Sequence, residues 1–245
     1  MKIAVLSDIH GNIAALEAVL TDAKRRGATQ CVNLGDICSG ALYPRETAER
    51  LMALDLPTIR GNHERQATEQ ALDYMGPSDK HAATSLTSAQ LRWLADLPLT
   101  LRLNEDVLMV HGAPTSDLIY LLETVTPDGL RAAADEEIKQ RIETVDAKVI
   151  LCGHTHIARI VQLSDGRLIV NPGSVGLQAY YDDHPYPHVV EMGSPHARYA
   201  MLSFADNQWQ AELFMVEYDW QEAAAEAEAN CRPDWAIALR TGFMS

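Results

Sequence analysis

Basic residues are scarce in this chain. Of its 245 residues, 20 are Lys or Arg and 34 are Asp or Glu, so the formal net charge is −14 at pH 7. A groove for long nucleic acid needs many basic residues to neutralise phosphates, so this class of partner is not expected. A small phosphorylated ligand remains compatible with the acidity, because a bound metal ion can reverse the local field.

Long apolar runs and clustered cysteines are also missing. No stretch of 18 apolar residues occurs, which predicts no membrane-spanning helix and no membrane partner. No basic stretch precedes a long apolar one near the N-terminus, so no secretory signal is predicted. The four cysteines are scattered without a C-x-x-C pair, which is typical of reduced thiols (Cys31, Cys38, Cys152 and Cys231). These absences predict a cytoplasmic protein.

Short apolar strands alternate with amphipathic helices near the N-terminus. Residues 3–6 and 31–34 are expected to form buried strands, and a third strand is expected to end at Ile59. Between the first two, apolar residues recur at steps of three and four, which predicts a helix (Ile13, Leu16, Val19, Leu20 and Ala23). This βαβαβ pattern predicts a parallel sheet with helices packed on it.

The second half of the chain is richer in strands. Residues 107–110 and 149–152 are expected to be buried strands, and hairpins are expected around Asp165-Gly166 and Asp206-Asn207. The β-rich half following the βα half predicts two sheets packed together in an α/β fold. The hydrophobic fraction of 47% suits a globular chain, and no repeat or linker divides it, so one domain is predicted over 1–245.

Two segments are candidates for a lid over the functional site. Four apolar residues spaced by four predict a helix within 113–146, which either covers the functional site or packs on the core (Leu130, Ala134, Ile138 and Ile142). Segment 176–198 contains a Pro- and Tyr-rich stretch that either overhangs the site or forms a surface loop. Four histidines match no motif and are expected at surface or loop positions (His81, His184, His188 and His196).

Polar residues of the metal-binding type recur where predicted strands end. They are Asp8, His10, Asp36, Asn62, His63, His111, His154 and His156. Because the carboxyl ends of strands line the ligand crevice of an α/β sheet, these side chains are expected to converge. Carboxylate, amide and imidazole donors suit Mn, Fe, Zn or a related divalent ion. Two Asp, one Asn and four His exceed one ordinary site, so two metals sharing a bridging carboxylate are predicted, with Asp36 as the bridge.

Glycines adjoin several of these residues. Gly35, Gly61, Gly112 and Gly153 each stand beside a candidate ligand in an expected sharp turn from strand to loop. A side chain there would crowd the backbone or the metals, so glycine is required for steric reasons.

A resemblance to a known family rests on five motifs in a fixed order. They are Asp8-x-His10, Gly35-Asp36, Gly61-Asn62-His63-Glu64, His111-Gly112 and Gly153-His154-Thr155-His156. Over residues 1 to about 175 the chain resembles the calcineurin-like metallophosphoesterases, above all their small prokaryotic phosphodiesterase and diadenosine-tetraphosphatase-like branch. The resemblance implies a four-layer α/β/β/α sandwich of two mixed sheets flanked by helices, and a metal-dependent phosphoesterase.

The resemblance also implies a role for each site residue. One divalent ion would be held by Asp8, His10, Asp36 and His156, and the second by Asp36, Asn62, His111 and His154; Mn, Fe, Zn, Ni and Mg are the candidates. His63 would be catalytic, stabilising the phosphoryl oxygens or protonating the leaving oxygen. A metal-bridging hydroxide would attack phosphorus in line. The substrate would be a small phosphomonoester, phosphodiester or nucleotide.

Departures from the family pattern narrow the expected class of substrate. The second motif, residues 35–40, lacks the Asp that supports the catalytic His and the Arg that grips phosphate in serine/threonine phosphatases of this superfamily. That argues against a protein phosphatase. Arg60 is either a phosphate contact or a structural arginine.

Two other functions are compatible with the same fold. A non-catalytic metal-binding scaffold of the same fold, as in the retromer subunit, tends to lose ligands, whereas this chain keeps all seven and His63. A DNA nuclease would need a basic surface, which a net charge of −14 does not offer.

Overall fold

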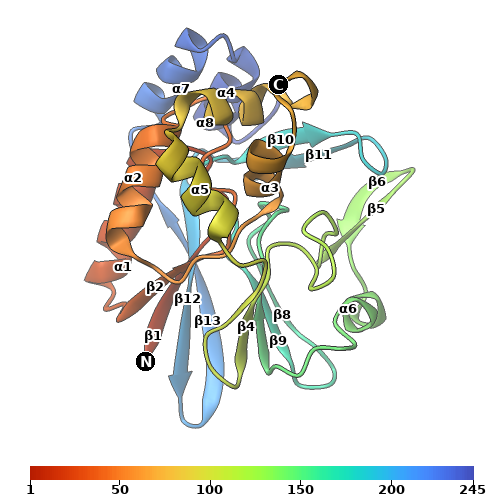
Figure 1. Ribbon diagram of the computed structural model, residues 1–245. Helices are drawn as coiled ribbons and strands as arrows, with labels where there is room; N and C mark the ends of the chain where they lie inside the picture. The colour runs from red at the N-terminus through yellow and green to blue at the C-terminus, as the bar shows by residue number, and fades with distance from the viewer.

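Two mixed β-sheets face each other at the centre of the computed structural model, which describes all 245 residues (Figure 1). The first sheet has the order β13-β12-β1-β2. Its strands are β1 (Lys2–Leu6), β2 (Gln30–Asn33), β12 (Ala197–Ala205) and β13 (Gln208–Val216). Strand β1 pairs parallel with β2 and antiparallel with β12. The third predicted strand is reduced to one parallel bridge between Asn33 and Thr58.

The second sheet has the order β3-β4-β7-β9-β8. Its strands are β3 (Leu101–Arg102), β4 (Val107–Met109), β7 (Val149–Leu151), β8 (Arg159–Gln162) and β9 (Leu168–Asn171). The β4-β7-β9 centre is parallel, and the two outer strands are antiparallel to their neighbours. Both predicted hairpins form, as β8-β9 and β12-β13.

Apolar side chains from both sheets fill the space between them. Val5 and Val32 from the first sheet meet Met109, Leu151 and Val170 from the second in one fully buried cluster. Because side chains alternate across a strand, the neighbouring residues point to the outer faces. On the edge strand β13, the buried face changes along the strand: Trp209 packs between the sheets, but Phe214 packs on the outer face.

Helices cover the outer face of the first sheet. Helix α1 (Ile13–Arg25) buries the predicted stripe, including Leu16 and Val19, against that face, and α2 (Pro44–Leu54) and α5 (Ser88–Asp96) lie beside it (Figure 1). Helix α3 (Asn62–Glu69), the 3-10 turn η1 (Leu72–Tyr74) and α4 (Pro77–Ser85) lead from the centre of the molecule to its upper edge.

Segment 113–146 differs from the predicted helix. It contains the hairpin β5 (Glu123–Thr126) and β6 (Gly129–Ala132), followed by the short helix α6 (Asp135–Arg141). Leu130 lies in β6, because Gly129 turns the chain with φ of +112°. Ala134 is the N-cap of α6, Ile138 lies within it and Ile142 is its C-cap; the two isoleucines pack on the outer face of the second sheet. The fourth layer is therefore this short helix.

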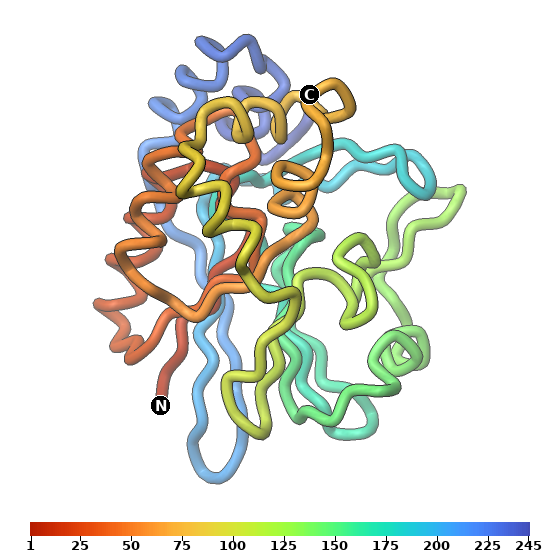
Figure 2. The backbone as a smooth tube through the Cα atoms, viewed as in Figure 1, coloured from red at the N-terminus to blue at the C-terminus, as the bar shows by residue number.

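The chain after β9 builds the upper end of the molecule. The hairpin β10 (Ala179–Asp182) and β11 (His188–Glu191) projects there, and helices α7 (Trp220–Ala229) and α8 (Pro233–Thr241) pack beside it. Figure 2 shows the C-terminal end of the chain next to the turn that joins α3 to α4. The predicted α/β/β/α sandwich is thus confirmed. No helix in the structure is both long and apolar enough to cross a bilayer.

The inter-sheet core generates a stability prediction. Leu202 is fully buried between the sheets, whereas Leu213 on the paired strand is 38% exposed. Leu202→Ala should lower the free energy of unfolding by about 2–5 kcal/mol, because it leaves a cavity, whereas Leu213→Ala should cost about 1 kcal/mol or less. Urea unfolding followed by tryptophan fluorescence measures both; equal losses would contradict the assigned core.

Candidate metal centre

The structure brings all seven predicted ligands to one place. Each follows the carboxyl end of a strand except Asn62, which begins α3. Their ligand atoms form two close groups, Asp8 with His10 and His156, and Asp36 with His111 and His154; within each group the atoms lie within 4.8 Å of one another. Asn62 joins the second group, since its Oδ1 lies 3.1 Å from His111 Nε2.

Asp36 belongs to the second group and contacts the first group through its backbone. Its Oδ2 is 3.1 Å from His111 Nε2, and its Oδ1 accepts a hydrogen bond from the backbone N–H of His63 (3.0 Å). Its backbone carbonyl accepts from the N–H of His10 (3.0 Å), which ties the loop of the first group to Asp36.

Three of the imidazoles are oriented by backbone carbonyls. The Nδ1 atoms of His10, His111 and His156 contact the carbonyl oxygens of Ser39 (2.7 Å), Leu34 (2.8 Å) and Leu177 (2.8 Å). A carbonyl can only accept, so each Nδ1 carries a proton, and the neutral rings of His10 and His156 present the Nε2 lone pair to the site. For His111, the charge of Asp36 outweighs burial and raises the pKa to about 9.

The free lone pairs face one another. His10 Nε2 lies 3.0 Å from His156 Nε2, and His156 Nε2 lies 3.6 Å from Asp8 Oδ1. Two neutral imidazoles in this tautomer have no proton to place between these nitrogens, so their lone pairs repel. A divalent cation removes the repulsion and accepts both donors. The donor set therefore fits a metal ion.

Burial sets the protonation of these groups. It lowers the pKa of His10 to about 4 and that of His154 to about 3, which keeps both rings neutral and able to bind metal at pH 7. Burial also raises the pKa of Asp8 to about 7. For Asp36, the charges of His111 and His63 outweigh burial and hold the pKa well below its ordinary value.

The backbone is strained at five of the predicted ligands. Asp8, His10, Asp36, His154 and His156 adopt φ values between +53° and +70°, in the left-handed region that non-glycine residues avoid. Each such residue costs about 1–3 kcal/mol and persists only where its surroundings over-determine it. The strain is concentrated at the candidate metal centre.

Two glycines make room for the carboxylates. A Cβ on Gly61 would collide with Asp36 Oδ1, and a Cβ on Gly153 would collide with Ser7 Oγ and lie 2.9 Å from Asp8 Oδ2. The predicted steric requirement for glycine at these two turns is confirmed.

Glu64 is a buried carboxylate whose role the motif did not reveal. It accepts hydrogen bonds from the backbone N–H groups of Asp36 (2.8 Å), Ile37 (2.7 Å) and Gly61 (2.8 Å). Glu64 therefore locks the loop of Asp36 to the start of α3, and so to Asn62. The signal available in the sequence was its position three residues after the N-cap Gly61, where a glutamate commonly bonds back to the cap.

Asp79 is a second residue that sequence reasoning missed. Its Oδ1 lies 2.7 Å from His63 Nδ1, although it comes from α4, sixteen residues along the chain. This contact supports the histidine, although the second motif lacks an Asp for that role. Burial alone would lower the pKa of His63, but Asp36 and Asp79 outweigh it and raise that pKa to about 10.

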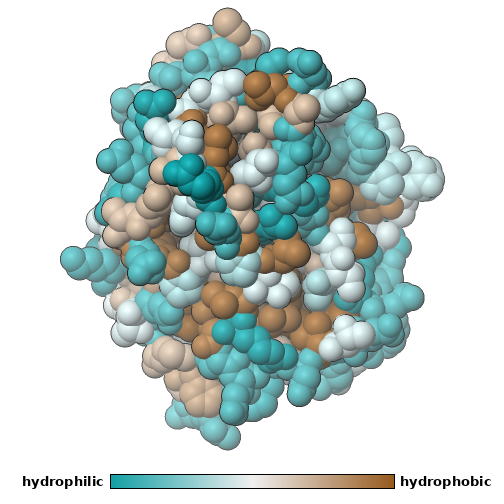
Figure 3. All heavy atoms as spheres, in the orientation of Figure 1, coloured by the Kyte–Doolittle hydropathy of each residue, from teal (hydrophilic) through white to brown (hydrophobic).

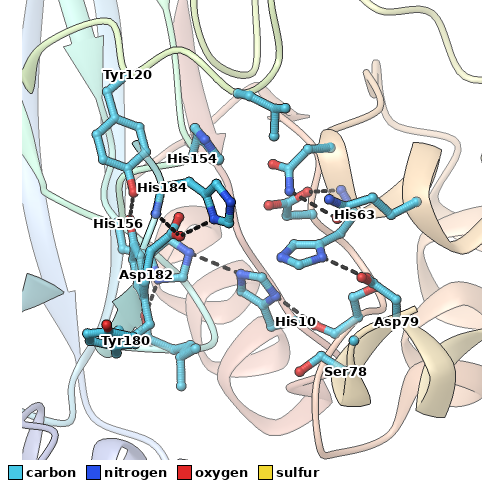
Figure 4. A pocket seen from close by; sticks show the side chains of 18 of the residues that line it. His10, His63, Ser78, Asp79, Tyr120, His154, His156, Tyr180, Asp182 and His184 are labelled. Carbon is cyan, nitrogen blue, oxygen red and sulfur yellow. Dashed lines mark hydrogen bonds and ion pairs between the residues drawn. The ribbon is translucent and has the colours of Figure 1, made fainter. Parts of the chain in front are cut away.

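A cavity of about 1100 Å³ opens onto the centre. Figure 4 shows His10, His63, His154 and His156 converging on it, with Asp79 behind His63. Arg60 does not line this cavity; its Nη1 pairs with Glu69 (3.0 Å), which favours the structural alternative for this arginine.

Two tyrosines pack edge-on against the histidines. The Tyr120 ring lies 5.0 Å from that of His154, and the Tyr180 ring 4.8 Å from that of His156. Their hydroxyl oxygens are 2.7 Å apart, and Tyr120 Oη lies 3.0 Å from His188 Nε2. The expectation of a surface position for His188 is wrong, because the hairpin β10-β11 buries it under this contact. His184, in contrast, is exposed.

With this geometry established, comparison identifies the family. The sequence profile of the calcineurin-like phosphoesterase superfamily domain matches residues 1–192. The chain belongs to this superfamily. It is a metal-dependent phosphate ester hydrolase.

Two similar proteins align with nearly the whole length of this phosphoesterase. A crystal structure of a metallophosphoesterase from Sphaerobacter thermophilus is 26% identical, with a TM-score of 0.76 and 99% of each chain covered. An uncharacterized protein of Methanocaldococcus jannaschii is 29% identical over 95% of this chain and 94% of its own. A crystal structure of a putative diadenosine tetraphosphatase, 16% identical with a TM-score of 0.54, covers 86% of this chain and 93% of its own and shares the fold.

The His63–Asp79 pair of the phosphoesterase generates a pH prediction. The pKa of folded His63, about 10, exceeds the ordinary 6.5, so the pair stabilises the fold fully below about pH 6.5 and stops doing so as pH rises through 10. In metal-free protein, Asp79→Asn should move the pKa of His63 back toward 6.5, as measured by NMR titration of the imidazole. Asp73→Asn, an exposed change nearby, is the control; an unmoved pKa in Asp79→Asn would contradict the pairing.

Proposed function

We propose that this phosphoesterase is a dinuclear-metal phosphohydrolase of a small phosphomonoester, phosphodiester or nucleotide. One observation carries the proposal: the candidate ligands form two close groups, Asp8 with His10 and His156 and Asp36 with His111 and His154, and the N–H of His10 bonds to the backbone carbonyl of Asp36. A single ion would leave one group of facing donors unsatisfied, at the cost of burying polar groups without partners.

The ligand assignment follows the two groups. Asp8, His10, Asp36 and His156 would hold one ion, and Asp36, Asn62, His111 and His154 the other. The oxygen and nitrogen donors suit Mn, Fe, Zn, Ni or Mg, and Cys38 and Cys152 make no contribution, because burial raises both thiol pKa values well above the ordinary value. When bound, the two ions supply Lewis acidity and an activated water for in-line displacement at phosphorus.

His63 is the proposed catalytic side chain. Its raised pKa keeps the ring protonated at neutral pH, and its side chain remains 28% exposed to the cavity. A protonated imidazole can donate to a phosphoryl oxygen or give its proton to the leaving oxygen. Asp79 accepts from Nδ1, so Nε2 is the atom left to carry this proton.

We also propose a cytoplasmic location. All four cysteines are unpaired, which supports a reducing compartment.

Metal content tests the assignment. Protein loaded with Mn²⁺ should contain about two ions per chain, and Asp36→Asn should lose metal together with at least a hundredfold of its activity on bis-para-nitrophenyl phosphate. Asp183→Asn, from the exposed acidic group at residues 182–184, should change neither. The proposal fails if no divalent metal supports turnover of this ester or of para-nitrophenyl phosphate and Asp36→Asn leaves the metal content unchanged.

His63→Ala separates catalysis from a metal-binding scaffold. The variant should retain its metal, because His63 is in neither ligand group, and lose about 10²–10⁴-fold in kcat, the usual contribution of a general acid. Elemental analysis and steady-state kinetics measure the two effects. Undiminished turnover in the variant would show that His63 is not catalytic.

A further inference from the structure

The cavity is much larger than a phosphate group requires. Its volume of about 1100 Å³ is that of a site for a whole organic ligand, and the candidate metal centre occupies one part of it. The rest of the cavity lies between the α3–α4 region and the β10-β11 hairpin, and it must accommodate the group esterified to phosphate (Figure 4).

Four large apolar side chains line this cavity and are nevertheless exposed. They are Tyr74 (85% exposed), Tyr181 (57%), Leu118 (55%) and Ile119 (46%), and we name them the apolar rim. Figure 3 shows polar side chains over most of the periphery of the molecule, with apolar ones gathered toward the centre of the face. Exposed apolar groups clustered at a cavity indicate a binding surface.

Each part of the rim is tied to the reaction centre by its own segment. Tyr74 precedes the turn that carries Asp79 to His63. Tyr181 follows Tyr180, which packs on His156, and the two aliphatic residues precede Tyr120, which packs on His154. The rim therefore comes from three segments, each of which also provides a residue that contacts His63, His154 or His156.

Positive charge is almost absent from the cavity wall. No lysine lines it, and its two guanidinium groups are already engaged. Arg232 bonds to both carboxylate oxygens of Asp234 (3.0 and 2.7 Å) and to Ser78 Oγ (3.0 Å). Arg141 donates to backbone carbonyls, including that of Glu123 (2.9 Å).

The carboxylates of Asp79, Glu123, Asp182 and Asp234 also line the cavity. A second or third phosphate of a polyphosphate would meet these acids without a free cation to neutralise it. Binding of like charges in this way is unfavourable.

We propose, on the basis of the function proposed above, that the apolar rim binds a planar aromatic group that is retained on phosphorus when an ester with a single phosphate is hydrolysed. The tyrosine rings offer stacking faces, and the two aliphatic side chains offer apolar contact. Dinucleoside polyphosphates are then poor substrates, because only the metals and His63 can neutralise phosphate in this cavity, and both serve the phosphate that reacts.

Two diesters with the same leaving group test the rim. Methyl para-nitrophenyl phosphate and bis-para-nitrophenyl phosphate both release para-nitrophenolate, but only the second retains an aromatic group on phosphorus. With the Mn²⁺-loaded enzyme, kcat/KM divided by the uncatalysed rate should favour the bis-aryl ester by about tenfold or more, the scale of one aromatic stacking contact. Equal values would overturn the proposal.

Rim variants show where the preference arises. Tyr74→Ala and Tyr181→Ala should each reduce the bis-aryl preference several-fold. Both should leave kcat/KM for the methyl ester within about twofold, because that ester lacks the retained aromatic group with which the tyrosines would stack. Tyr186→Ala is the matched control, an exposed tyrosine of the same hairpin that does not line the cavity. Equal losses on both esters, or no loss in either rim variant, would contradict a role for the rim.

A polyphosphate substrate distinguishes failure of the rim proposal from failure of the proposed function. Diadenosine tetraphosphate should be hydrolysed with a lower kcat/KM than thymidine 5′-para-nitrophenyl phosphate, which has one phosphate and aromatic groups. The reverse order would overturn the substrate class but leave a dinuclear hydrolase standing. Absence of turnover on every ester, in contrast, would overturn the proposed function and the rim together.

Discussion

Facing donor atoms buried without protons between them are the constraint on which the rest of this molecule depends. His10 and His156 turn their Nε2 lone pairs toward each other, and the Asp8 carboxylate lies beside His156. Such groups are costly to bury unless a cation joins them. Three features hold these atoms together. Five candidate ligands have a left-handed backbone, glycines at 61 and 153 leave room for the carboxylates, and backbone carbonyls orient three of the imidazoles.

The two-sheet architecture explains how distant motifs meet. Strands β1 and β2 belong to one sheet and β4 and β7 to the other, and all four direct their carboxyl ends to the same region. Glu64 joins the loop after β2 to the start of α3, so the second group of ligands is assembled from both sheets and a helix. The C-terminal helices, beyond the segment that matches the family, complete the cavity wall with Trp235, whose ring lies 5.9 Å from that of His10.

The candidate ligands were predictable because all except Asn62 follow an apolar strand, and strand ends converge for topological reasons. Asp79 and the tyrosines Tyr120 and Tyr180 were not, since their contacts depend on how loops from separate segments pack. Segment 113–146 was misread because its spacing by four joined residues of a strand to residues of a helix. His188 was misplaced because the burial of a hairpin residue depends on its tertiary neighbours.

The acidity of the chain also gains a physical interpretation. Two of its carboxylates, Asp8 and Asp36, lie in the candidate metal centre, and the cavity wall adds others that disfavour extra phosphates. The most direct test of this account is an anomalous-scattering map of crystals loaded with Mn²⁺. We predict two peaks, one beside Asp8, His10 and His156 and the other beside Asn62, His111 and His154, with Asp36 between them. A single peak, or a peak only at residues 182–184, would contradict the account.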